Sequence, residues 1–162
     1  MILTKKKKFL FSLPILIGLI LMITLASPVF ANPSNELVIY LSADRTGAKA
    51  SGLSIEQGIR TALAENSNRL GSYKVSLKNL DHRGSTPRFK KHLSLYLNDP
   101  QALVLYSGLH SPPLLATRKF INTHGVLVLV PWAAAAPITR YPSAQNWIFR
   151  LSIDDSKAGY VI

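Results

Sequence analysis

The stretch Ala102-Leu103-Val104-Leu105-Tyr106-Ser107-Gly108-Leu109-His110-Ser111-Pro112-Pro113 decides the fold. Its first five residues are continuously apolar, which predicts a strand that is buried on both faces. A tight loop follows at 107–110, and the two prolines after Ser111 are typical of the first turn of a helix. A buried strand that leads directly into a helix is the repeating unit of an α/β fold with a parallel sheet.

The same alternation extends in both directions from this stretch. Apolar or alternating patterns predict further strands at 36–42, 73–80, 126–130 and 147–151, the second of them nearer the sheet edge. Amphipathic patterns predict helices over 53–66, from Thr86 (as N-cap) to 97 and over 111–123, with another beginning at Ser156 or Lys157. We therefore predict an α/β fold, a three-layer parallel sheet with helices on both faces.

Ligands of such sheets bind at the carboxyl ends of the strands, here the segments 43–51, 81–85, 107–111, 131–136 and 152–156. Ser111 opens a helix, whose free N–H groups suit a carboxylate, although Pro112 and Pro113 remove two donors. The other interpretation of Ser111 is a helix N-cap. Asp155 is a candidate partner for a ligand ammonium, or an N-cap for the helix that follows.

The segment after the fourth strand supplies further candidates. Trp132 is a candidate aromatic wall, or it packs against its own loop, and the small residues of 133–136 allow backbone to approach a ligand closely. Arg45 and Lys49, in the first loop, are cations that attract an anionic solute or are simply solvated.

The N-terminus has the pattern of a secretory signal peptide. Four lysines at 5–8 precede an apolar run over 9–26, and small residues at Val29 and Ala31 are typical of a cleavage site. We predict a signal peptide at 1–31 and a domain at 32–162, exported to the periplasm. An uncleaved membrane anchor is the alternative, and it is the only membrane association that the sequence predicts.

Composition excludes several classes. Without the lysines at 5–8, 15 Lys and Arg face 8 Asp and Glu, and these cations look scattered over the polar faces of successive elements, so we expect solvated surface and no nucleic-acid partner. The chain has no cysteine, and its four histidines lack metal-ligand spacing and are expected at the surface. Because no catalytic or cofactor motif is present, we expect no enzyme, no cofactor and no metal site.

Several strings, taken in order, carry a resemblance to a known family. They are Leu53-Ser54-Ile55-Glu56-Gln57-Gly58-Ile59-Arg60, Asp81-His82-Arg83-Gly84, Asp99-Pro100-Gln101-Ala102-Leu103-Val104, Gly125-Val126-Leu127-Val128-Leu129-Val130-Pro131 and Phe149-Arg150-Leu151-Ser152-Ile153-Asp154-Asp155-Ser156. Over residues 36–162 the chain resembles the N-terminal lobe of the type I periplasmic solute-binding proteins of ABC importers, the leucine/isoleucine/valine-binding family.

The resemblance implies a binding component that delivers a small solute, such as an amino acid, to a membrane permease. The ligand carboxylate would meet Ser111, Ala133 and Ala135, and the ammonium would meet Asp155. The chain departs from the family in Pro112-Pro113, in a 133–136 run without threonine and in Ser51 where an aromatic is often found.

The length also departs from the family, whose members have two lobes. We expect an incomplete, N-terminal lobe with weak solute binding at best. The alternatives are a ligand-sensing or regulatory module, and a periplasmic interaction protein with the same fold.

Overall fold

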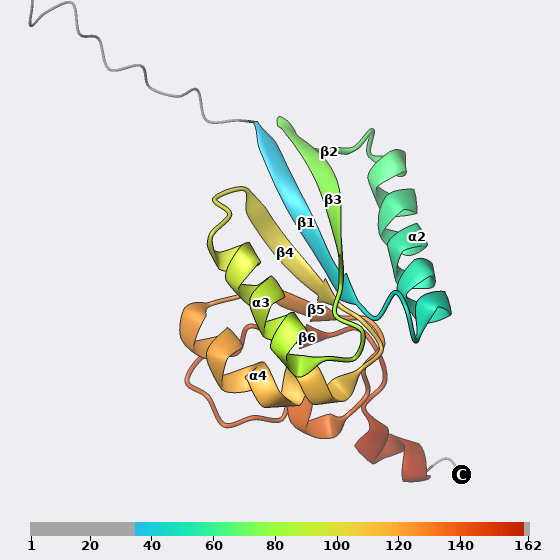
Figure 1. The fold of residues 1–162 in the computed structure, drawn as a ribbon, viewed down its shortest axis with the longest axis vertical. Helices are drawn as coiled ribbons and strands as arrows, with labels where there is room; N and C mark the ends of the chain where they lie inside the picture. The colour runs from blue at the N-terminus through green and yellow to red at the C-terminus, as the bar shows by residue number, and fades with distance from the viewer. Residues whose placement is uncertain (1–34, 161–162) are drawn as a thin grey trace, which may run out of the picture. The chain divides into compact units, whose positions relative to one another are not determined.

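The computed structural model describes residues 35–160, and the predicted signal peptide at 1–31 lies outside them. Strands and helices alternate along the chain (Figure 1). The strands are β1 (Glu36–Ala43), β2 (Arg69–Leu70), β3 (Tyr73–Asp81), β4 (Ala102–Ser107), β5 (Val128–Val130) and β6 (Ile148–Arg150). The helices are α2 (Lys49–Glu65), α3 (Thr86–Leu97) and α4 (Ser111–His124), with short 3-10 helices η1 (Ala136–Ile138) and η2 (Asp155–Tyr160).

The six strands form one sheet in the order β2-β3-β1-β4-β5-β6. All neighbours are parallel except β2 and β3, which pair antiparallel through a two-residue strand that the sequence did not predict. This short strand covers the outer edge of β3, so the expected parallel sheet is confirmed with one antiparallel addition. The parallel strands all end at one edge, which is where the polar loops gather.

Helices cover both faces of the sheet, as predicted (Figure 1). On one face α2 places Ile55 and Ile59 against Ile39 and Leu41 of β1. On the other face α3 and α4 lie side by side over a larger core that contains Tyr40, Leu105, Val128 and Ile148, with Phe89, Leu93, Leu114 and Ile121 from the helices. This second core fixes the start of α4, and with it Ser111.

Several predicted boundaries shift by a few residues. Helix α2 begins at Lys49, four residues before the predicted start, so the first loop is shorter than 43–51 and Ser51 lies buried inside the helix. Helix α3 is capped by Ser85 rather than Thr86, and the Ser85 hydroxyl accepts the N–H of Arg88. Only 128–130 and 148–150 pair as strand within the predicted 126–130 and 147–151.

The expectation that all four histidines lie at the surface is wrong. His82 is 1 % exposed, and its Nδ1 accepts the N–H of Gly84 at 2.9 Å. His92 is partly buried, with Nδ1 2.8 Å from the buried hydroxyl of Ser42. The His82 ring lies edge-on to Phe89 of α3, with 5.8 Å between the ring centroids, so this helix covers it. Among the described residues no helix is both long and apolar enough to cross a bilayer.

Candidate functional site

Ser111 and Ala135 meet at the carboxyl edge of the sheet, although 24 residues separate them. The N–H of Ala135 donates to Ser111 Oγ over 3.3 Å. Ser111 is the first residue of α4, while His110 occupies the N-cap position without a side-chain cap bond, so the N-cap interpretation of Ser111 is wrong. A hydroxyl that accepts one N–H still has its own proton to donate, so Ser111 has the chemistry to bind a carboxylate oxygen.

Asp155 closes the same loop from the other side. Its Oδ1 accepts the N–H of Ala136 at 2.8 Å, and its own N–H donates to the carbonyl of Ala134 at 3.0 Å. The cap-like contacts belong instead to Asp154, which accepts the N–H and the hydroxyl of Ser156, so the N-cap interpretation of Asp155 is wrong. Asp155 is exposed, and its second oxygen makes no hydrogen bond with the described residues. That oxygen suits an ammonium group.

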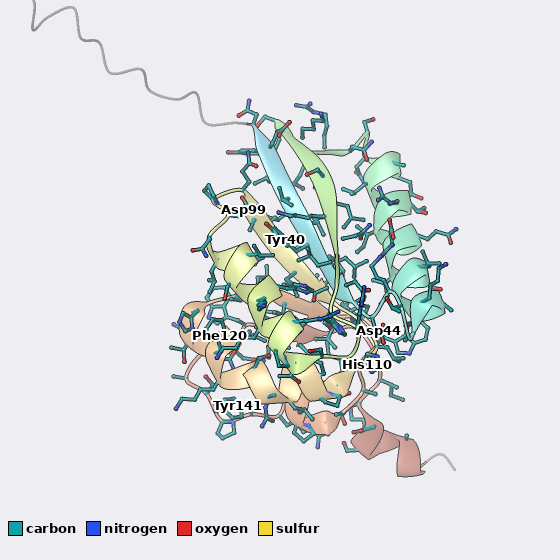
Figure 2. All side chains as sticks on the ribbon, in the orientation of Figure 1. Tyr40, Asp44, Asp99, His110, Phe120 and Tyr141 are labelled. Atoms are coloured by element: carbon teal, nitrogen blue, oxygen red, sulfur yellow. The ribbon has the colours of Figure 1, made fainter. Side chains whose placement is uncertain are left out.

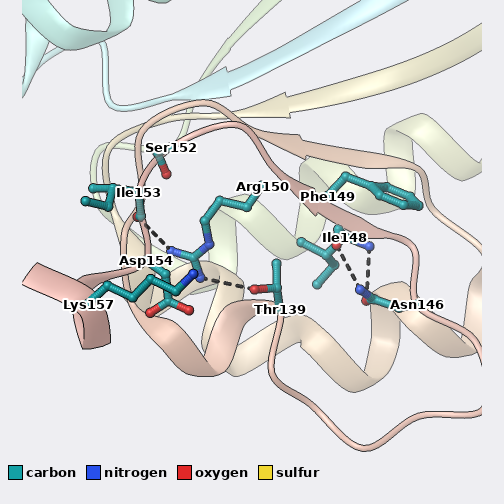
Figure 3. Close-up of a pocket in the computed structure, with 9 residues that line it drawn as sticks. All are labelled: Thr139, Asn146, Ile148, Phe149, Arg150, Ser152, Ile153, Asp154 and Lys157. Carbon is teal, nitrogen blue, oxygen red and sulfur yellow. Dashed lines mark hydrogen bonds between the residues drawn. The ribbon is translucent and has the colours of Figure 1, made fainter.

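Arg150 organises this loop, and the sequence analysis did not single it out. Its guanidinium donates to the carbonyls of Ala133, Ala134 and Ala135. It also reaches the Ile153 carbonyl and the Thr139 hydroxyl (Figure 3). The residue spacing in β6 could have indicated this role, because residues two apart on a strand share a sheet face and Ile148 is fully buried. A cation on an inward face needs acceptors, and the irregular segment 133–135 provides them.

Ala133 and Trp132 lie in different surroundings from the Ser111–Asp155 cluster. Ala133 is 1 % exposed and packs in the core, while its carbonyl accepts from Arg150 and Ser152. Trp132 is 45 % exposed and lines a hollow of about 350 Å³ together with Leu109 and the first turn of α2. The structure therefore brings Ser111, Ala135 and Asp155 together, buries Ala133 and leaves Trp132 as a wall facing α2.

The turn between β1 and α2 is held by Asp44, and Gly47 and Ala48 of this turn line the hollow. Asp44 accepts the N–H groups of Thr46 and Gly47, and its Oδ2 lies 3.0 Å from Nε2 of His110. Burial opposes ionisation, but these hydrogen bonds outweigh it and hold the pKa of Asp44 below its ordinary value. Asp44 thus ties the turn to the loop that precedes α4 (Figure 2).

The two cations that the sequence offered as anion attractors behave differently. Arg45 forms an ion pair with Glu56, so the charge of Arg45 is neutralised within the protein. Glu56 also pairs with Arg60 and accepts a hydrogen bond from the Asn79 amide. Lys49 lies in the first turn of α2, exposed, and forms no ion pair with a described residue. No group of three or more metal-binding side chains comes together within the described part of the chain.

Comparison with solved structures identifies the fold. A benzoate-bound solute-binding protein of an ABC transporter from Rhodopseudomonas palustris matches with a TM-score of 0.67 and 26 % identity, over 76 % of this chain and 34 % of its own. A leucine-binding protein from Thermotoga maritima matches with a TM-score of 0.66 and 19 % identity, over 77 % of this chain and 35 % of its own.

An ABC-type branched-chain amino acid transporter protein from Rhodopseudomonas palustris matches with a TM-score of 0.65 and 23 % identity, over 75 % of this chain and 33 % of its own. This chain thus spans about a third of the length of the solved structures it matches. No protein-family model matches the chain, and no curated protein matches it.

Proposed function

We propose that this chain, which has the fold of the solute-binding proteins of ABC transporters, contributes one wall of a binding site for a small carboxylate-bearing solute. The structures it resembles are binding proteins rather than enzymes, in agreement with the expectation of a non-catalytic protein. Three of these neighbours were solved with 3,4-dihydroxybenzoic acid, 4-hydroxybenzoate and benzoate, and a fourth is described as a leucine-binding protein. All of these solutes carry a carboxylate.

One observation carries the proposal: Ser111, Ala135 and Asp155 converge at the carboxyl edge of the sheet. The Ser111 hydroxyl would donate a hydrogen bond to the solute carboxylate, since its oxygen already accepts the N–H of Ala135. Asp155 would use its remaining oxygen for an ammonium, and would have no partner on a benzoate. Trp132 and Leu109 would supply apolar contact at the neighbouring hollow. Within this proposal the protein acts outside the cytoplasm and delivers its solute to a membrane permease.

Leucine and benzoate distinguish the two proposed roles. In ¹⁵N-labelled protein, we expect millimolar additions of a cognate solute to shift the amide signals of Ala135 and Ala136. Ser111→Ala should weaken the response to either carboxylate, whereas Asp155→Asn should weaken the response to leucine alone. Glu65→Gln, at the exposed last residue of α2, is the control.

The proposal fails if neither solute, nor 4-hydroxybenzoate, moves these amide signals. It also fails if the two variants lose the response equally for both solutes, because a general loss of loop structure would then account for the result.

A further inference from the structure

Helices α3 and α4 form an outer layer with one sign of charge. Together they carry five Lys and Arg residues, and all eight Asp and Glu residues of the chain lie elsewhere. The five cations are Arg88, Lys90, Lys91, Arg118 and Lys119. They look scattered in the sequence, but the two helices pack side by side on one face of the sheet (Figure 1), which brings the five cations to one side of the protein. We call this surface the α3/α4 face.

Two lysines of the α3/α4 face are directed outwards. Lys91 lies opposite the buried residues Phe89, Leu93 and Tyr96 of α3, and Lys119 lies opposite the buried Leu114, Thr117 and Ile121 of α4. Both lysines are exposed, and none of the five cations forms an ion pair with a residue between 35 and 160. Of the ten other Lys and Arg residues between 35 and 160, half have a carboxylate partner, namely Arg45, Arg60, Lys74, Arg83 and Arg140.

Apolar groups are interleaved with these charges. Leu95 and Leu97 of α3 are 47 % and 39 % exposed. The Phe120 ring stacks on His124 at 4.1 Å between centroids, with the Lys90 ammonium 5.9 Å from the ring, and Arg118 lies 4.7 Å above the Tyr141 ring. Lys and Arg residues beside leucine and aromatic side chains also occur on helices that lie on a bilayer.

We propose that the α3/α4 face binds the anionic lipid headgroups of a membrane surface. Two adjacent helices present outward lysines side by side, which matches a layer of lipid phosphates. Cations without acidic neighbours repel one another in solution, and lipid phosphates relieve this repulsion. The N-terminal residues 5–26, with four lysines and an apolar run, also bring the chain to a membrane during export or hold it there.

The test is flotation of the full chain with vesicles at 0.1 M salt. One set of vesicles contains 30 mol% phosphatidylglycerol in phosphatidylcholine, and the other contains phosphatidylcholine alone. Residues 5–26 contribute equally in every variant, so differences between variants isolate the folded domain. The double variant Lys91→Gln/Lys119→Gln removes one outward lysine from each helix. The matched control Arg69→Gln/Lys74→Gln removes two exposed cations from β2 and β3 at the far edge of the sheet.

Each cation near an anionic surface contributes about fivefold in affinity, so the Lys91/Lys119 pair should weaken binding to phosphatidylglycerol vesicles by about 25-fold. The Arg69/Lys74 pair should change it by less than about threefold, since charges beyond about 10 Å are screened at this salt concentration. Binding to phosphatidylcholine should be the same for all variants. Equal losses from both pairs would overturn the proposal, as would equal binding to the two lipids. Binding to soluble poly-glutamate in preference to anionic vesicles would overturn it in favour of an acidic polypeptide partner.

Discussion

Nη2 of Arg150 lies 2.6 Å from the carbonyl oxygen of Ala135, so a cation on β6 fixes the backbone of the loop that follows β5. The amide of the same residue faces Ser111 on α4. One side of the loop is therefore held by the sheet and the other by a helix, and the orientation of the amides at Ala135 and Ala136 depends on the guanidinium. Arg150 is in this sense a positioning residue for the proposed solute site.

We expect Arg150→Met to lower the free energy of unfolding by about 2–3 kcal/mol, because hydrogen bonds from a charged donor to several partly buried carbonyls are lost. The stability of Arg150→Lys should lie between that of Arg150→Met and that of the wild type, since one ammonium cannot reproduce the planar guanidinium. Urea unfolding measures both. Arg60→Met, at a side chain that is 57 % exposed and pairs with Glu56, should change stability by no more than about 0.5 kcal/mol. Equal effects at positions 150 and 60 would contradict the role assigned to Arg150.

Stability should fall between about pH 6.5 and pH 4 because of His82. Burial, together with repulsion from His110 and His92, lowers the pKa of His82 from 6.5 to about 4. A group whose pKa is lower in the folded state contributes stability that is present above the unfolded value and lost as the pH falls towards the folded value. Asp44 and Asp81 face this cluster, and hydrogen bonds hold their pKa values below the usual range, so their contributions are lost only below about pH 4.

Urea unfolding at pH 7, 6, 5 and 4.5 tests this dependence. His82 contributes at most about 1.4 kcal/mol per pH unit to the slope of the free energy of unfolding against pH. Burial also lowers the pKa of His92, which adds a slope of the same sign. His82→Asn should flatten the dependence while leaving the part due to His92. A variant with the slope of the wild type would show that His82 is not the group that titrates.

The order of the main elements could be predicted from the sequence because it depends on local patterns. Continuous apolar runs such as 102–106 mark buried strands, and Gly125 ends α4 in the left-handed conformation that glycine favours at this position. Long-range polar contacts could not be predicted in this way. The partners of Arg150 and Ser111, and the burial of His82, depend on which loops meet at one edge of the sheet. Clustering of the cations on α3 and α4 also depends on the packing of two helices that the sequence separates.

Tyr40 ties the amino end of the sheet together, far from the proposed site. Its hydroxyl donates to Asp99 Oδ2 at 2.6 Å from a fully buried position, and burial and this carboxylate raise the pKa of the phenol. Tyr40→Phe should cost about 1–3 kcal/mol in urea unfolding, because Asp99 loses a short hydrogen bond and keeps the N–H of Gln101. Tyr73→Phe, at a side chain that is 44 % exposed, is the matched control and should be nearly neutral. A neutral Tyr40→Phe would mean that water replaces the lost partner.

Two glycines should respond to alanine with opposite signs. A Cβ at Gly108 would lie 2.9 Å from Cα and 3.0 Å from Cβ of Ala43, so the loop after β4 could not keep its close approach to the end of β1. Because backbone would have to move, Gly108→Ala should destabilise the protein by about 1–3 kcal/mol. Gly58 lies within α2, where a Cβ would meet nothing within 4 Å. Gly58→Ala should therefore stabilise the protein by about 0.5–1 kcal/mol through helix propensity. Unfolding midpoints in urea compare the two, and a neutral Gly108→Ala would mean that β1 and the 108–110 loop are less tightly packed than the structure has them.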